Sequence, residues 1–174
     1  KPTLKSIADL ALRPQWCLGM LGTKNRTFGN IVGHAPGVTN MNSLSEWTHA
    51  QFDPTLDWDA IEWIKSKWDG KLILKGINDV EDAEIAAKVG ADALIVSNHG
   101  GRQLDGSRSP FDQLAEIVDA VGDKIDVICE GGIQRGTHVL KALSVGAKAC
   151  SGGRLYLYAL AAAGQPGVER ALGN

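Results

Sequence analysis

Short apolar runs alternate with segments of helical period over residues 57–174, and this alternation limits the fold more than any other feature. The apolar runs are Leu72–Leu74, Ala93–Val96, Val127–Cys129 and about Ala147–Ser151. Runs this short and this apolar are typical of strands that are buried on both faces. Strands that alternate with helices form a parallel sheet with right-handed crossovers. We therefore expect an α/β fold with four successive βα units.

Helical segments separate these runs. The first is predicted from apolar residues at helical spacing, namely Trp58, Ile61, Ile64 and Trp68. Asn78 followed by Glu81 predicts a capped helix start, and Gly90 marks the end of that helix. Two further helices are expected over residues 110–121 and 137–145.

Composition narrows the class of protein. The chain has 174 residues and a net charge of −2, which gives no electrostatic footprint for nucleic acid. Cys17, Cys129 and Cys150 lie far apart without metal spacing, so we expect free thiols of a reducing compartment and no metal site. No signal peptide is visible, and no apolar run approaches the ~20 residues that span a bilayer.

Polar residues follow each predicted strand at its carboxyl end. Lys75 ends the first strand, His99 and Arg102 follow the second, Glu130 follows the third, and Arg154 follows the fourth. The carboxyl ends of parallel strands lie at the same edge of a sheet, so residues distant in sequence converge there. This pattern predicts one site at that edge.

The run from Ser97 to Asp105, Ser-Asn-His-Gly-Gly-Arg-Gln-Leu-Asp, resembles the active-site motif of the FMN-dependent (S)-2-hydroxy acid dehydrogenases and oxidases. The similarity extends from about Pro14 to Ala171. It implies a TIM (β/α)8 barrel of which this chain is the C-terminal half, strands five to eight, with the preceding long loop. Residues 1–56 would form that loop region, and residues 57–174 would form the half-barrel. A whole barrel needs roughly 200 residues or more, which is longer than this chain. We thus expect a fragment of a longer protein.

The resemblance assigns roles to Lys75, after the first predicted strand, and to residues of the loop after the second. His99 would be the base that removes a proton from the substrate, although a lone loop histidine is more often structural. Arg102 offers a planar fork that matches a carboxylate, although the same residue could form a surface salt bridge. Ser97 resembles the family residue that hydrogen-bonds the flavin. Lys75 would stabilise negative charge on the reduced flavin.

Two glycine-rich loops resemble a phosphate cradle for FMN. They supply the predicted cofactor ligands Glu130, Gly131, Gly132, Gln134, Gly153 and Arg154. Three positions depart from the family pattern. Glu130 stands where the family usually has Asp, and Gln134 stands where it usually has an arginine. Leu155 stands where a proline often follows the arginine at position 154. Any tight βα turn uses glycine, so these loops alone are a weak signal. His34, His49 and His138 are interpreted as structural or solvated.

The implied reaction is the oxidation of an (S)-2-hydroxy acid to the 2-oxo acid. Phe52–Trp58, Glu62–Trp63 and Trp68–Gly70 resemble the L-lactate dehydrogenases of the family, so L-lactate is the favoured substrate and a quinone or cytochrome the favoured electron acceptor. The alternative is a catalytically silent half-barrel or interaction module that needs its N-terminal half. Open strand edges predict a homo-oligomer.

Two interpretations are possible for the N-terminal segment. Leu10–Val38 mixes large apolar residues with glycines and prolines and has no sustained period. It either packs on the barrel or touches a lipid surface, as in membrane-associated members of the family. We expect a cytoplasmic protein, with peripheral contact to the inner face of the cell membrane under the second reading.

Overall fold

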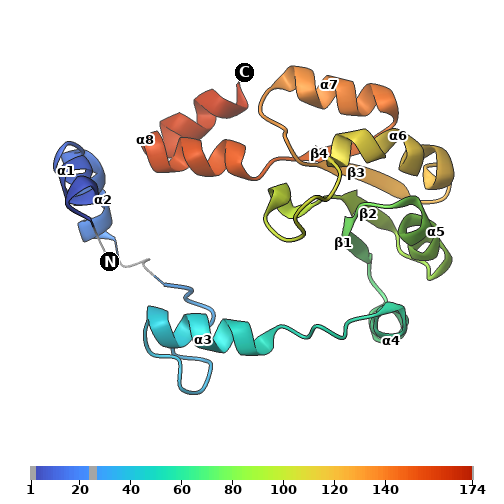
Figure 1. Ribbon diagram of the computed structural model, residues 1–174, viewed down its shortest axis with the longest axis horizontal. Coiled ribbons are helices and arrows are strands. Elements are labelled where there is room, and N and C mark those ends of the chain that lie inside the picture. The colour runs from blue at the N-terminus through green and yellow to red at the C-terminus, as the bar shows by residue number, and fades with distance from the viewer. Residues whose placement is uncertain (1–2, 24–26, 174) are drawn as a thin grey trace. The chain divides into compact units, whose positions relative to one another are not determined.

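The computed structural model describes residues 3–23 and 27–173 (Figure 1). The chain divides into two compact units, Lys1–Thr55 and Leu56–Asn174. Each unit is described by itself.

The first unit contains three helices, α1 (Leu4–Ala11), α2 (Pro14–Gly22) and α3 (Met41–Gln51). The Thr3 side chain caps α1, and Asn40 caps α3 in a reciprocal capping box with Ser43. Regular helices in this segment differ from the irregular loop that the missing period suggested. α2 has no side-chain cap and begins at Pro14, and neither α1 nor α2 buries any of its residues.

The second unit is built on a four-stranded parallel sheet. Its strands are β1 (Ile73–Ile77), β2 (Ala93–Val96), β3 (Asp126–Glu130) and β4 (Ala149–Ser151), in the order β1-β2-β3-β4. The prediction of an α/β fold with a parallel sheet is confirmed.

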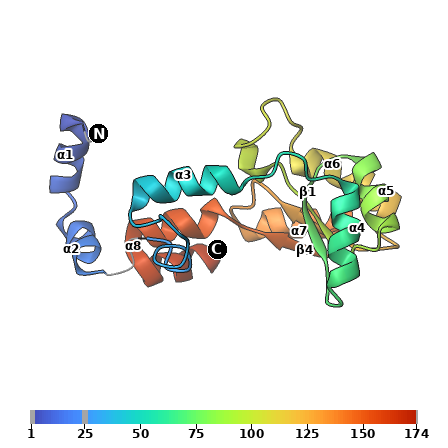
Figure 2. The ribbon, with the colours of Figure 1, turned by 90° about the horizontal axis from the view of Figure 1, so that it is seen from below.

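Helices precede, separate and follow these strands. They are α4 (Trp58–Lys67), α5 (Val80–Lys88), α6 (Pro110–Val121), α7 (Gly136–Val145) and α8 (Arg154–Leu172), with a 3₁₀ turn η1 (His99–Gly101) after β2. The last helix is interrupted at Ala163 and Gly164, where the backbone leaves helical geometry and the chain turns (Figures 1 and 2). None of the helices in residues 3–23 and 27–173 has both the length and the apolar composition needed to cross a membrane.

The two faces of the sheet differ in burial. Leu74, Leu94 and Val127 lie in one register row and belong to the buried core, which includes Leu114 and Ile117 of α6. Full burial of a leucine such as Leu94 contributes about 1.5–3 kcal/mol. Side chains alternate between faces along a strand, so the neighbouring row points the other way.

The opposite face of the sheet is less covered. Lys75, Ile95, Ile128 and Ala149 share a register row on it. Ile95 and Ile128 are half-buried, and Ile73, two residues before Lys75, is exposed. Helices therefore cover one face of the sheet more completely than the other.

Three predicted boundaries are wrong. β1 continues to Ile77, so Lys75 lies inside the strand, which changes register between Lys75 and Ile77. Asp79 caps α5 in place of Asn78, whose side-chain amide donates instead to Ser107 and Arg108. The fourth strand begins only at Ala149.

Candidate functional site

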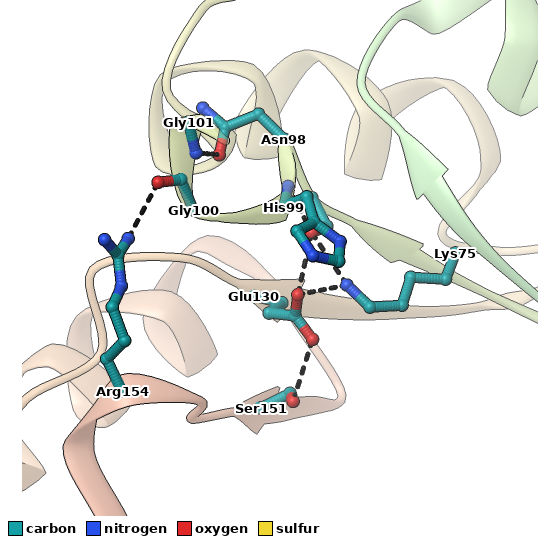
Figure 3. A network of polar contacts seen from close by, with 9 residues as sticks. Lys75, Asn98, His99, Gly100, Gly101, Glu130, Ser151 and Arg154 are labelled. Carbon is teal, nitrogen blue, oxygen red and sulfur yellow. Dashed lines mark hydrogen bonds and ion pairs between the residues drawn. The ribbon is translucent and has the colours of Figure 1, made fainter. Parts of the chain in front are cut away.

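The carboxyl ends of the four strands bring together residues that are far apart in sequence (Figure 3). Lys75 comes from β1, Ser97 follows β2, Glu130 ends β3 and Ser151 ends β4. They meet around a single carboxylate. Of the predicted site residues, Lys75, Ser97 and Glu130 meet in this cluster, whereas Arg102 forms no hydrogen bond or ion pair with it among the described residues.

Glu130 is the centre of this cluster. Its Oε1 accepts hydrogen bonds from Lys75 Nζ, in a close ion pair, and from Ser97 Oγ at 2.8 Å. Its Oε2 accepts from Ser151 Oγ at 3.0 Å. Burial raises the pKa of Glu130, but the hydrogen bonds from Lys75, Ser97 and Ser151 outweigh this effect and leave the pKa below its usual value. Glu130 is therefore an anion in a partly buried site.

Ser97 links the cluster to the next loop. Its side chain is buried, and its hydroxyl donates to Glu130 while accepting from Lys75 Nζ and from the backbone N–H of His99, both at 3.1 Å. A hydroxyl has one proton and two lone pairs, so these three bonds use its full capacity. A hydrogen bond from this hydroxyl to a flavin would replace one of them.

His99 opens the turn η1 with an unusual backbone. Its φ is 56°, a left-handed value that costs a non-glycine residue about 1 kcal/mol or more. Gly100 and Gly101 continue with positive φ, and the Asn98 side chain accepts from the N–H of Gly101 at 3.0 Å. The turn exposes the imidazole at the carboxyl edge of the sheet.

Arg154 fixes the other side of this turn. Its guanidinium donates to the carbonyl of Gly100 at 2.7 Å (Figure 3). A side chain at position 100 would collide with the guanidinium. Arg154, predicted as a phosphate ligand, thus lies against the loop that carries His99.

Arg102 follows the turn and is exposed. Within the described part of the chain it has no hydrogen bond or ion pair, unlike Arg108, which pairs with Glu116. Its fork of donors is therefore available for an external carboxylate.

A hollow of about 260 Å³ separates the His99 turn from the glycine loop after β3. Its lining comes from both loops and the start of α6 and α8, namely Asn98, Gly100, Gly101, Ser109, Pro110, Gly131, Gly132 and Arg154. Four glycines without side chains, one guanidinium and the amino end of α8 suit a phosphate group. The residues present therefore fit the phosphate end of FMN.

Gln134 and Gly153, also predicted as cofactor ligands, are not among the residues that line this hollow. Gln134 is exposed, and its backbone N–H lies 3.3 Å from His138 Nδ1, which is also 3.0 Å from the carbonyl of Gly132. Gly153 is the residue before α8. His138 thus shapes the loop, in agreement with a structural role.

The sequence did not point to Ser151 or Asn98 as site residues. Ser151 looked like the end of an apolar strand, and only its register partner Glu130 reveals its contact with the carboxylate. The three cysteines are free thiols, and burial, followed by the neighbouring Cys150, raises the pKa of Cys129 to about 11.

Comparison with known proteins decides the family. The family model described as FMN-dependent dehydrogenase matches residues 1–174. The chain belongs to this family of FMN-dependent 2-hydroxy acid dehydrogenases. The family resemblance and the cofactor FMN that the sequence predicted are confirmed.

Individual relatives support the same assignment. An L-lactate dehydrogenase of Caulobacter sp. (strain K31) is 42% identical over 171 residues, which cover 97% of this chain and 45% of the relative. An L-lactate dehydrogenase of Vibrio cholerae is 44% identical, with the same coverage. The chain thus spans about 45% of the length of these relatives.

Solved structures agree with the fold. The monotopic membrane protein (S)-mandelate dehydrogenase is similar at a TM-score of 0.87 and 35% identity, over 99% of this chain and 45% of that chain. A mandelate oxidase variant with an FMN adduct has a TM-score of 0.62 and 46% identity, over 66% of this chain and 37% of that chain. Lactate and mandelate enzymes are both among the relatives.

Proposed function

We propose that this chain carries the catalytic half of an enzyme that oxidises an (S)-2-hydroxy acid, L-lactate above all, to the 2-oxo acid. The observation that supports it is the convergence of Lys75, Ser97, His99 and Glu130 at the carboxyl edge of a parallel sheet in a member of this family. Catalytic groups of (β/α)8 enzymes lie at this edge.

The roles follow from chemistry and geometry. His99 is the base that takes a proton from the substrate, and Arg102 holds the substrate carboxylate through its unpaired fork. Loss of two electrons and two protons converts the hydroxyl carbon to a carbonyl. FMN, when bound, supplies the acceptor for the electron pair.

Cofactor contacts are proposed for residues that face the same edge. Lys75 and Ser97 lie where the flavin ring would bind, with Glu130 beside them. Gly131, Gly132, Gly153 and Arg154 would hold the phosphate, with Gln134 at the rim of the loop. The final electron acceptor is proposed to be a quinone or a cytochrome.

Residues 57–174 are proposed to be the second half of a (β/α)8 barrel. The sparsely covered face of the sheet and a hollow of about 410 Å³ beside β1, lined by Ile73, Lys75 and Trp58 among others, support this arrangement. The other four strands would close over that face. The edges of β1 and β4 would pair with them, or with a second copy of the chain.

Steady-state dye reduction tests the substrate. The protein that carries this chain is assayed with added FMN on L-lactate, D-lactate and (S)-mandelate. We expect the highest kcat/KM for L-lactate and no turnover of D-lactate. A preference for mandelate would correct the substrate, and bound flavin without turnover of any 2-hydroxy acid would support the silent module instead.

Peripheral membrane contact is proposed for the first unit. Leu4, Ile7 and Leu10 are exposed at helical spacing on α1, and Trp16, Leu18 and Leu21 are exposed on α2. An apolar stripe of this kind binds at a lipid interface. The fraction of protein that co-sediments with phosphatidylglycerol vesicles should be lower for the double variant Leu4→Ser, Ile7→Ser than for wild type. Equal fractions for wild type and the double variant would contradict the proposal.

A further inference from the structure

The ammonium group of Lys75 is not a free cation in this structure. It donates to Glu130 Oε1 and to Ser97 Oγ, and Ser97 donates in turn to the same carboxylate oxygen. Glu130 is less exposed than Lys75, with 19% against 42% of the side chain accessible. The negative partner is therefore the more fixed of the two.

Glu130 is itself held from the opposite side. Ser151 on β4 donates to Oε2, so the carboxylate spans from Lys75 on β1 to Ser151 on the other edge strand (Figure 3). Its two oxygens together accept three hydrogen bonds. Such bonds fix the orientation of a carboxylate and favour its ionised form.

We propose that Glu130 is a positioning residue that holds Lys75 at the carboxyl edge of the sheet and cancels most of its positive charge there. A charge that faces an opposite charge at contact distance presents a much weaker field to a third group. Lys75 then directs hydrogen bonds at a ligand more than it supplies net charge. The sequence predicted that Lys75 stabilises negative charge on the reduced flavin, and the proposed pairing with Glu130 weakens that effect.

The consequence for the flavin rests on the proposed function. Reduction of the flavin adds negative charge, and an uncompensated Lys75 would favour it. With Glu130 in place, Lys75 favours reduction less. Removal of the carboxylate charge should therefore raise the midpoint potential of bound FMN.

A first experiment needs no cofactor. The flavin-free chain reacts with N-acetoxysuccinimide at fixed pH, and mass spectrometry of peptides gives the acetylation rate at Lys75. We expect Glu130→Gln to raise this rate several-fold, because an amide does not form the ion pair. Glu130→Asp keeps the charge but is one methylene shorter, so it should give a smaller rise, and Ser151→Ala a smaller one still.

Asp92→Asn is the matched control, because Asp92 pairs with Lys65 and Lys71 at the opposite end of the sheet. It should speed acetylation of Lys71 and leave that of Lys75 unchanged. An unchanged Lys75 rate in Glu130→Gln would overturn the proposal, provided circular dichroism shows a folded protein. If Glu130→Gln does not fold, the rates in Glu130→Asp and Ser151→Ala decide in the same way.

A second measurement uses the flavin-loaded protein. Equilibration with a redox dye should show a higher reduced fraction of FMN in Glu130→Gln than in wild type at the same dye ratio, with Asp92→Asn unchanged. An equal or lower fraction would overturn the charge compensation. Failure to bind FMN in the presence of the N-terminal half of the barrel would contradict the proposed function, while the acetylation rates would still decide the role of Glu130.

Discussion

At the scale of single residues, Ser97 connects the carboxylate of Glu130, the ammonium group of Lys75 and the backbone of the proposed base His99. Its hydroxyl bonds to Glu130, to Lys75 and to the N–H of His99. The backbone of His99 has a left-handed φ, and this bond helps to maintain it. Among the described residues no side chain hydrogen-bonds to the imidazole, and its main chain sets its position.

Arg102 supplies the first prediction. Replacement of Arg102 by lysine should raise KM and lower kcat/KM for L-lactate by roughly tenfold to a hundredfold. This change corresponds to the loss of one charged hydrogen bond, which contributes about 1.5–3 kcal/mol. Flavin reduction over a range of lactate concentrations measures the effect, and oxalate binding reports the carboxylate contact alone. Arg108→Lys, which alters an arginine paired with Glu116, is the control. Unchanged constants for Arg102→Lys would assign the carboxylate to another residue.

At the scale of elements, Asp92 joins α4, β1 and β2 at the amino end of the sheet. It accepts from Lys71 Nζ at 2.8 Å, from the N–H of Leu72 at 2.9 Å and from Lys65 Nζ at 3.1 Å. These hydrogen bonds, from Lys71 first, lower the pKa of Asp92 well below its usual value. The pairing is far from the proposed chemistry, so it tests the fold separately.

Asp92→Asn should lower the thermal midpoint by a few degrees at neutral pH. A carboxyl with a lowered pKa stabilises the fold fully above its unfolded pKa, about 3.9, and this contribution is lost as pH falls through the folded pKa. The difference in thermal midpoint between wild type and Asp92→Asn should therefore become smaller as the pH falls. Thermal unfolding from pH 7 to pH 2 measures this difference, with Glu84→Gln, at an exposed position of α5, as a surface control. A difference that does not depend on pH would exclude the charge as its cause.

The glycine loop after β3 gives a second test at this scale. Gly131 has a φ of 139°, and a Cβ there would approach Pro110 Cγ to 2.9 Å, whereas Gly132 has a φ of 70° and open space. Gly131→Ala should cost about 1–3 kcal/mol of unfolding free energy and more than Gly132→Ala, which costs only left-handed strain of roughly 1–2 kcal/mol. Urea unfolding compares the two. The reverse order would show that the contact with α6 is not tight.

Elements with a strong apolar pattern could be predicted from the sequence, and those defined by local polar contacts could not. Ala93–Val96 is uniformly apolar, and its strand is found with the predicted bounds. β1 continues through Lys75 and Gly76, residues that do not indicate a strand. Asn78 and Asp79 are both good capping residues, and only the competing contacts of Asn78 decide between them.

The site shows the same division. Lys75, Ser97 and Glu130 could be expected near one another because they lie at or near the carboxyl ends of predicted strands, but Ser151 and the contacts among these side chains could not be predicted. Glu130 lies 55 residues from Lys75 and 33 from Ser97 in sequence, and Ser151 lies 21 beyond it. Register between parallel strands determines which side chains meet, and no local pattern encodes that register. The ion pair that revises the role of Lys75 therefore appears only in the structure.

At the scale of the whole molecule, the sparsely covered sheet face predicts complementation. This chain, mixed with the N-terminal part of the Caulobacter L-lactate dehydrogenase, should bind FMN more tightly than either piece alone, because the second half of a barrel would bury the cofactor. Flavin absorbance after size-exclusion chromatography measures it, with bovine serum albumin as an unrelated partner. Equal flavin binding by the chain alone would contradict the half-barrel.

His99 is proposed to be the base in the oxidation of a 2-hydroxy acid by bound FMN. Anaerobic rapid mixing of the FMN-loaded protein with L-lactate tests this role most directly, in wild type and His99→Gln, with His138→Gln as a control at a loop histidine. His99→Gln should retain FMN, but its flavin should be reduced roughly a hundredfold to ten-thousandfold more slowly. A flavin reduction rate near that of wild type in His99→Gln would exclude His99 as the base.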